Sequence, residues 1–178
     1  DLPRLKALGV DILWLMPIHP IGEVNRKGPL GSYYAAKDYL AVNPEFGGEQ
    51  DLRDLVNAAH AQGQRVILDW VPNHVSPDNP LTKTHPDFFW RDEQGNLTPP
   101  HGTDWTDVVQ FNFDAPGLLD YQAGVLLHWV QNFGIDGFHY GGRGECRRHE
   151  DQAAVGAGGG FGLGHGVEHR YVVHLLAA

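Results

Sequence analysis

Short apolar runs alternate with longer amphipathic stretches along the first 140 residues of the chain. Continuous apolar runs of this length are typical of strands buried in a parallel sheet, and they occur at 10–16, 66–71 and 135–140. Apolar residues at the i, i+3, i+4, i+7 spacing predict helices over 51–62 and 118–133, each followed by a glycine where a helix can end. Strands that alternate with helices predict right-handed crossovers and a parallel α/β sheet.

The segments around these elements also carry information. The opening DLPRLKALG has the leucine spacing and closing glycine of a helix end, so we expect the chain to begin within an element, as a fragment of a longer protein would. Residues 17–48 are rich in Gly, Pro and Tyr, which suits a long ordered loop. Residues 72–116 are too long for an ordinary connection, and we predict a functional excursion or small subdomain after the third strand of the fold.

The composition changes at residue 141, which divides the chain into an α/β part at 1–140 and a divergent Gly-rich tail at 141–178. The tail holds 10 of the 23 glycines and no Pro, Trp, Lys or Ile. A flexible tail is one interpretation. We favour a second one, a change of reading frame, because alternative frames of GC-rich DNA encode much Gly, Ala and Arg but little Lys, Asn or Ile.

Composition excludes several classes of partner. The net charge of −9 does not provide the basic surface that nucleic acid requires, and it gives no attraction to an anionic membrane. No apolar run approaches the length of a membrane span. Cys146 is the single cysteine, so an internal disulfide cannot form and the redox compartment stays undecided. We therefore expect neither nucleic acid nor a membrane as a partner.

Polar side chains directly follow one of the predicted strands. The segment VILDWVPNH (66–74) places Asp69, Asn73 and His74 at and just beyond the end of its apolar run. In a β/α barrel the C-terminal ends of the strands carry the site. A network that anchors the loop is the structural alternative, and for Asp69 the two interpretations are equally open.

Five segments, in their order and spacing, resemble the alpha-amylase family, glycoside hydrolase family 13. They are VDILWLMPI (10–18), LGSYYAAKDYLAVNPEFGG (30–48), DWVPNH (69–74), FNFDAP (111–116) and GIDGF (134–138). The resemblance covers about residues 1–138 and implies a partial (β/α)8 TIM barrel, from the first helix to the fourth strand. It also implies a parent protein that is a retaining glycoside hydrolase or transglycosylase in carbohydrate metabolism, acting on starch, maltooligosaccharides or another alpha-glucan.

The resemblance assigns the sugar contacts. Tyr34 matches a tyrosine whose ring stacks on a sugar, and Asp69 and His74 match residues that shape the pocket at the point of cleavage, so these three are the predicted substrate-binding residues. Asn73 matches a calcium ligand of some relatives, but we favour a role in fixing its loop and predict no metal site. The family implies no required cofactor, although calcium is possible in the parent.

Two further groups of residues suggest a functional role that we do not favour. Trp90, Trp105 and Phe111 in the excursion suit outer sugar sites, but packing of the excursion is the more ordinary role. The histidines of the tail invite a metal site, yet glycines flank His165 and no accompanying carboxylate pattern supports one.

The catalytic carboxylates of the family have no counterpart in this chain. Retaining glycosidases need two carboxyl groups about 5–5.5 Å apart, one as nucleophile and one as acid/base. Where the family continues from GF to Arg, any residue and the nucleophilic Asp, this chain has His139 at the arginine position and Gly141 at the nucleophile position. We therefore predict no catalytic residue and an inactive fragment. The alternatives are a non-catalytic carbohydrate-binding protein and a structural α/β protein without a sugar role, the latter disfavoured because no Gly-rich phosphate loop follows a strand.

Overall fold

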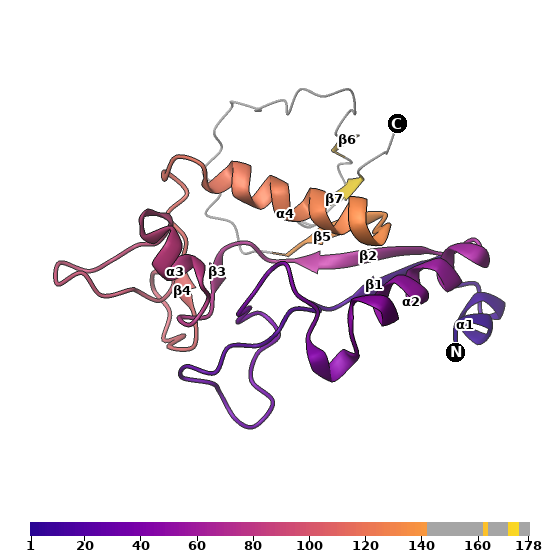
Figure 1. The fold of residues 1–178 in the computed structure, drawn as a ribbon, viewed down its shortest axis with the longest axis horizontal. Coiled ribbons are helices and arrows are strands. Elements are labelled where there is room, and N and C mark those ends of the chain that lie inside the picture. Colours follow the sequence, from indigo (N-terminus) through magenta and orange to yellow (C-terminus); the bar gives the residue numbers. More distant parts are fainter. Residues whose placement is uncertain (142–161, 164–170, 175–178) are drawn as a thin grey trace.

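The computed structural model describes residues 1–141, 162–163 and 171–174. One five-stranded sheet packs against the two long helices α2 and α4 (Figure 1). The elements in chain order are α1 (Leu2–Ala7), β1 (Ile12–Leu15), η1 (Pro44–Phe46), α2 (Glu49–Ala61), β2 (Arg65–Trp70), β3 (His74–Val75), α3 (Leu81–Thr84), η2 (Pro86–Phe88), β4 (Val109–Gln110), α4 (Leu118–Phe133), β5 (Gly137–Tyr140), β6 (Gly162–Leu163) and β7 (Tyr171–His174).

The first three strands of the main sheet form the parallel arrangement that the sequence predicts. β2 lies between β1 and β5 and pairs in parallel with both. The register places Leu68 beside Leu15 and Phe138, and it places Asp69 beside His139. Because successive side chains of a strand point to opposite faces, Leu68 and Asp69 lie on different faces of the sheet.

The sheet continues beyond β5 with antiparallel pairing, which the sequence analysis did not anticipate. β7 pairs with β5 and β6 pairs with β7, both antiparallel, so the sheet is mixed and has the order β1-β2-β5-β7-β6. Both strands belong to the segment 141–178. The other residues of that segment beyond Gly141 lie outside the described residues, and with them the predictions of a flexible tail and of a changed reading frame.

Helices α2 and α4 supply the core on one face of the sheet, as their apolar stripes predict. Val56 of α2 and Trp129 of α4 are buried in one cluster with Leu68 and Phe138 of the strands. The α4 helix ends at Gly134, whose φ of 71° lies in the left-handed region that favours glycine. Each of the two helices therefore buries its apolar face against the strands of the sheet.

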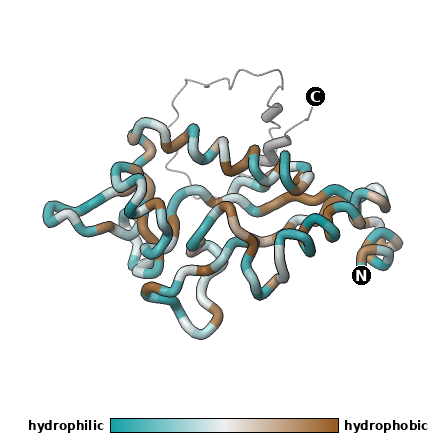
Figure 2. Tube along the Cα trace, viewed as in Figure 1, coloured by the Kyte–Doolittle hydropathy of each residue, from teal (hydrophilic) through white to brown (hydrophobic). Residues whose placement is uncertain are grey.

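The opposite face of the sheet is open along β1. Ile12 and Trp14 are 49% and 48% exposed, whereas the sequence analysis expected a strand at 10–16 buried on both faces. That expectation is wrong for β1, because Leu13 and Leu15 on one face of the strand pack against the core while the alternate residues Ile12 and Trp14 on the other face are half exposed. Figure 2 shows apolar residues along the strands, while the excursion is largely hydrophilic.

Residues 72–116 form a lobe beyond the C-terminal end of β2 (Figure 1). β3 and β4 pair antiparallel within it, and the rings of Phe89 and Phe111 stack with 5.0 Å between their centroids. Phe111 is fully buried, but Trp90 and Trp105 remain 47% and 44% exposed. Packing therefore accounts for Phe111 and leaves the two tryptophans unexplained.

Candidate functional site

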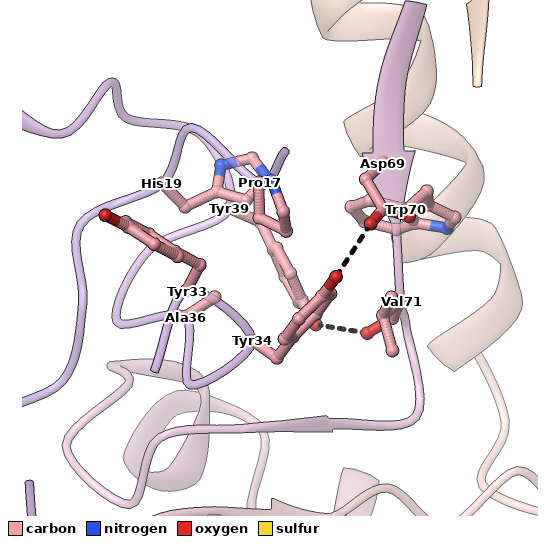
Figure 3. A pocket seen from close by; sticks show the side chains of 9 residues that line it. All are labelled: Pro17, His19, Tyr33, Tyr34, Ala36, Tyr39, Asp69, Trp70 and Val71. Carbon is pink, nitrogen blue, oxygen red and sulfur yellow. Dashed lines mark hydrogen bonds between the residues drawn. The ribbon is translucent and has the colours of Figure 1, made fainter. Parts of the chain in front are cut away.

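Asp69 lies at the C-terminal end of β2, and its side chain is almost completely buried. Both of its carboxylate oxygens are engaged. The Tyr34 hydroxyl donates to Oδ2 at 3.0 Å, as Figure 3 shows, and Nδ1 of His139 lies 3.2 Å from Oδ1. Three segments that are far apart in the sequence therefore meet at one carboxylate.

The Tyr34 hydroxyl is a stable donor in this arrangement. Partial burial raises its pKa, and the hydrogen bond and negative charge of Asp69 raise it further. The phenol thus remains protonated well above neutral pH. Tyr34 as a whole is still 38% exposed, although its hydroxyl is tethered to Asp69.

The loop between β1 and α2 that carries Tyr34 is anchored at both sides. The Tyr39 hydroxyl donates to the carbonyl oxygen of His74 at 2.9 Å. In turn, the indole Nε1 of Trp129 in α4 donates to the carbonyl oxygen of Tyr39 at 2.9 Å. Tyr39 therefore connects the loop to the start of the excursion and to the helix behind the sheet, which restrains the position of the Tyr34 ring.

Gly22 marks a second, closer contact between this loop and the excursion. A Cβ at residue 22 would lie 1.8 Å from Oγ and 2.2 Å from Cβ of Ser76, so only glycine fits there. The Ser76 hydroxyl donates to Asp78, and the other carboxylate oxygen of Asp78 accepts the backbone N–H of Glu23 at 3.0 Å. Lys37 lies 3.7 Å from the same carboxylate. The loop and the excursion are thus held together by direct packing and by charge.

A small pocket lies beside the hydrogen bond between Tyr34 and Asp69 (Figure 3). The space inside it suits about one water molecule. The lining residues are Pro17, His19, Tyr33, Tyr34, Ala36, Tyr39, Asp69, Trp70 and Val71.

His19 is a pocket residue that the sequence analysis did not single out. Burial lowers the pKa of its imidazole to about 4, and its Nδ1 has no hydrogen-bond partner among the described residues. Its ring lies 5.3 Å from that of Tyr39 and 5.5 Å from that of Trp129. The sequence feature that could have identified His19 is its position just after the apolar run at 10–16, since Asp69 lies in the same way at the end of an apolar run.

His74 lies apart from the pair of Tyr34 and Asp69. It is buried at the start of β3 and is not among the residues that line the pocket. Burial lowers the pKa of its imidazole to about 4. The ring of Trp105 meets it edge-on, with 5.8 Å between centroids. Of the three predicted substrate-binding residues, the structure brings two into direct contact and places the third outside that contact.

Asn73 makes a backbone contact that suits the loop-fixing role we favoured. Its carbonyl oxygen accepts the N–H of Phe111 at 3.1 Å, next to the pairing of β3 with β4. Within the described residues, no three His, Cys, Asp or Glu side chains gather where they could hold a metal ion.

The two positions at which this chain departs from the family lie next to Asp69. Gly141 continues β5, with its N–H donating to the carbonyl oxygen of Trp70 at 2.9 Å, and a Cβ there would lie 3.1 Å from Oδ1 of Asp69. The ring of His139 packs against Trp14, with 4.0 Å between centroids. A side chain at residue 141 would therefore point at the site, but glycine offers only backbone.

Parallel strands that present a buried carboxylate at their C-terminal end, with a tyrosine supplied by a neighbouring loop, define a barrel-type α/β domain with a site at the strand ends. The chain belongs to the alpha-amylase catalytic-domain family, whose model matches residues 1–141. This confirms the resemblance seen in the sequence. Among the described residues, no helix combines the length and apolarity needed to cross a membrane.

Solved structures and curated relatives agree with this assignment. A maltogenic alpha-amylase from Thermotoga neapolitana is similar with a TM-score of 0.76 and 41% identity, covering 82% of this chain and 34% of that one. An alpha-amylase from Lactobacillus plantarum has a TM-score of 0.75 and 50% identity, covering 79% and 33%. The alpha-1,4-glucan:maltose-1-phosphate maltosyltransferase of Salinibacter ruber is 34% identical over 168 residues, 78% of this chain and 25% of the relative. The chain thus has a partial TIM-barrel-like α/β fold and spans about a quarter of the curated relatives' length.

Proposed function

We propose that this chain supplies one wall of an alpha-glucan-binding pocket in a glycoside hydrolase or transglycosylase, and that it has no turnover by itself. The observation that carries the proposal is the hydrogen bond between Tyr34 and the buried Asp69 at the C-terminal end of β2. Membership of the alpha-amylase family supports a sugar ligand, since the similar proteins are alpha-amylases and a maltosyltransferase.

Tyr34 and Asp69 offer complementary groups to a sugar. The exposed part of the Tyr34 ring suits the C–H-rich side of a pyranose, because aromatic rings combine an apolar face with a fixed orientation. Each carboxylate oxygen of Asp69 accepts one internal donor, and it has a second lone pair for a sugar hydroxyl. The pair therefore binds one apolar and one polar feature of the same ligand.

Turnover needs groups that this wall does not contain. Retention requires an oxygen nucleophile beneath the anomeric carbon and an acid for the leaving oxygen, and residue 141 offers only backbone. Asp69 is held by Tyr34 and His139 rather than aimed as a nucleophile. The proposal uses no cofactor and no metal. A non-catalytic carbohydrate-binding protein is the alternative, and it would share the same wall.

Binding is tested with the purified chain and maltotriose by ligand-observed NMR or titration calorimetry. We expect a dissociation constant in the millimolar range, a free energy of about −4 kcal/mol, because only one wall contacts the sugar. Tyr34→Ala should abolish measurable binding. Phe113→Ala is the matched control, since Phe113 is exposed to a similar extent in the excursion and should leave binding unchanged. Equal binding by wild type and Tyr34→Ala would refute sugar recognition by this wall.

Turnover is tested on starch, maltotriose and an activated aryl glucoside. The comparison protein is a full-length version in which another reading frame of the coding DNA restores Arg-x-Asp after Phe138. We expect turnover only in that version. Turnover by the present chain that disappears in Asp69→Asn would overturn the proposal and make Asp69 catalytic. If no frame restores the signature, the non-catalytic alternative is favoured.

A further inference from the structure

The loop between β1 and α2 is closed at its base. Ile21 and Ala36 form an antiparallel bridge, and the N–H of Gly22 donates to the carbonyl oxygen of Ala35 at 2.9 Å. Loops whose two ends meet in this way are compact surface units that frequently carry function. Between the two sides of this base the loop contains the segment 24–31, which we call the strap.

The strap is exposed and has an unusual backbone. Val24 and Leu30 are 45% and 71% exposed. Asn25, Gly28 and Gly31 have φ angles of 55°, 65° and 69°, in the left-handed region. Little apolar burial is typical of segments that open locally at a small cost in free energy. The strap therefore depends on specific contacts to stay in its position.

Two polar contacts tie the strap to the excursion. Nδ2 of Asn25 donates to the carbonyl oxygen of Thr106 at 2.9 Å. Nζ of Lys27 lies 3.1 Å from Oδ1 of Asp107, and the two side chains are 51% and 7% exposed. Among the described residues these are the polar contacts between the strap and the excursion. Because Lys27 is half in water, dissolved salt can weaken its attraction to Asp107.

The turn that the strap holds, residues 104–107, packs against His74. The Trp105 and His74 rings meet edge-on with 5.8 Å between centroids, and the negative charge of Asp107 acts on the imidazole. Within the described part of the chain, the hydrogen bonds of this turn that do not involve the strap stay within 100–108. The strap is thus the outside support of the turn that shields His74.

We propose that the strap is a salt-sensitive latch, which keeps the 104–107 turn closed over the His74 side chain and lets the turn open when its two polar contacts break. High ionic strength favours the open form, because it screens the pair of Lys27 and Asp107. Tyr34 stays in place in both forms, since the base of the loop and the hydrogen bond to Asp69 do not involve the strap.

The first test follows the His74 imidazole by NMR titration in the full chain, at about 0.1 M and about 1 M NaCl, where the Debye length falls from about 10 Å to about 3 Å. Burial lowers the pKa of His74 to about 4, so opening should raise the pKa toward 6.5 at high salt. Screening of Asp107 without opening would lower the pKa, because that charge raises it. An unchanged or lower pKa at high salt overturns the proposal.

The second test uses Asn25→Gly, which removes the donor to Thr106, keeps the left-handed φ without strain and adds no charge. At low salt this variant should already have a raised His74 pKa, and trypsin should cut at Arg26 in the strap about fivefold faster than in wild type. Asn96→Gly is the matched control. It removes a side-chain hydrogen bond in an exposed turn of the same excursion and should change neither measurement.

The third test separates the ion pair from general effects of salt. Lys27→Met should abolish the salt dependence of the His74 pKa, whereas Lys6→Met should preserve it, because Lys6 pairs with Asp11 outside the loop and the excursion. Loss of the salt dependence in both variants, or its persistence in Lys27→Met, contradicts the latch.

The remaining outcomes also decide. A raised His74 pKa in Asn25→Gly without faster cleavage at Arg26 would mean that the turn opens while the strap stays closed, and it overturns the proposal. Should Asn25→Gly not fold, the salt titration of wild type decides. None of these measurements uses a sugar, so a failed latch leaves the proposed function standing, and a chain that binds no sugar can still have the latch.

Discussion

The hydrogen bond between Tyr34 and Asp69 can be tested for its energy as well as for its role. The perturbation is a double-mutant cycle of Tyr34→Phe, Asp69→Asn and the double variant, which isolates the pairwise term. Tyr34→Phe removes only the hydroxyl that donates at 3.0 Å, whereas Asp69→Asn removes the charge of the acceptor and turns one of its two oxygens into an NH2 donor. Both changes preserve side-chain shape, so packing should contribute little.

The magnitude follows from the burial of the two partners. A hydrogen bond to a charged group contributes about 1.5–3 kcal/mol when the group cannot be rehydrated. Asp69 is 6% exposed, which favours the full value, but Tyr34 is 38% exposed, so water can partly replace the hydroxyl. We therefore expect a coupling free energy of about 1–2 kcal/mol.

Urea unfolding followed by tryptophan fluorescence measures this coupling. With a slope of about 1–3 kcal/mol per molar urea, Tyr34→Phe should lower the midpoint by roughly 0.5–1 M. Tyr33→Phe is the control, because Tyr33 lines the same pocket and its hydroxyl makes no hydrogen bond to the described residues. A coupling below about 0.3 kcal/mol, within the usual error of additivity, would show that the pair does not act as a unit and would remove the basis for the binding wall.

Three further predictions concern the frame around the site. Trp129→Phe should cost about 1–3 kcal/mol of unfolding free energy in urea, because the buried carbonyl of Tyr39 loses its donor; an unchanged midpoint would contradict this. Gly22→Ala should lower the unfolding free energy by about 1–3 kcal/mol, because its Cβ clashes with Ser76. Gly124 is exposed within α4 and a Cβ there has no atom within 4 Å, so Gly124→Ala should raise the unfolding free energy by about 0.5–1 kcal/mol. If both variants change the unfolding free energy in the same direction, the close contact at Gly22 is contradicted. The pKa of His74 is about 4 in the folded chain, below its unfolded value of about 6.5, so stability should be complete above pH 6.5 and fall as the pH is lowered toward 4. His74→Gln should flatten this pH dependence of the unfolding midpoint, and an unchanged slope would exclude His74 as its source.

The sequence by itself determined the elements whose signals are local. The helix predicted over 118–133 has those bounds in the structure, and the strands at 66–71 and 135–140 are present within a residue or two. Their apolar runs and stripes act over a few residues, and each element is packed against its sequence neighbours in the βαβ order. Family resemblance then pointed to Tyr34 and Asp69, because the segments around them are similar to the family's own.

Only the tertiary structure decided how distant segments meet. The Asp69 contact with His139 depends on strand register, and the place of His19 depends on how a loop folds over Trp129, which lies 110 residues later. The exposure of Trp14 depends on what covers its face of the sheet, and the antiparallel pairing of β7 has no signal in the apolar pattern. Hydrophobic periodicity states which side of an element is apolar, but not which other segment covers it. For that reason the sequence could only point to Tyr34, Asp69 and His74 as candidates, whereas their contacts, and the separation of His74 from the other two, came from packing between segments far apart in the chain.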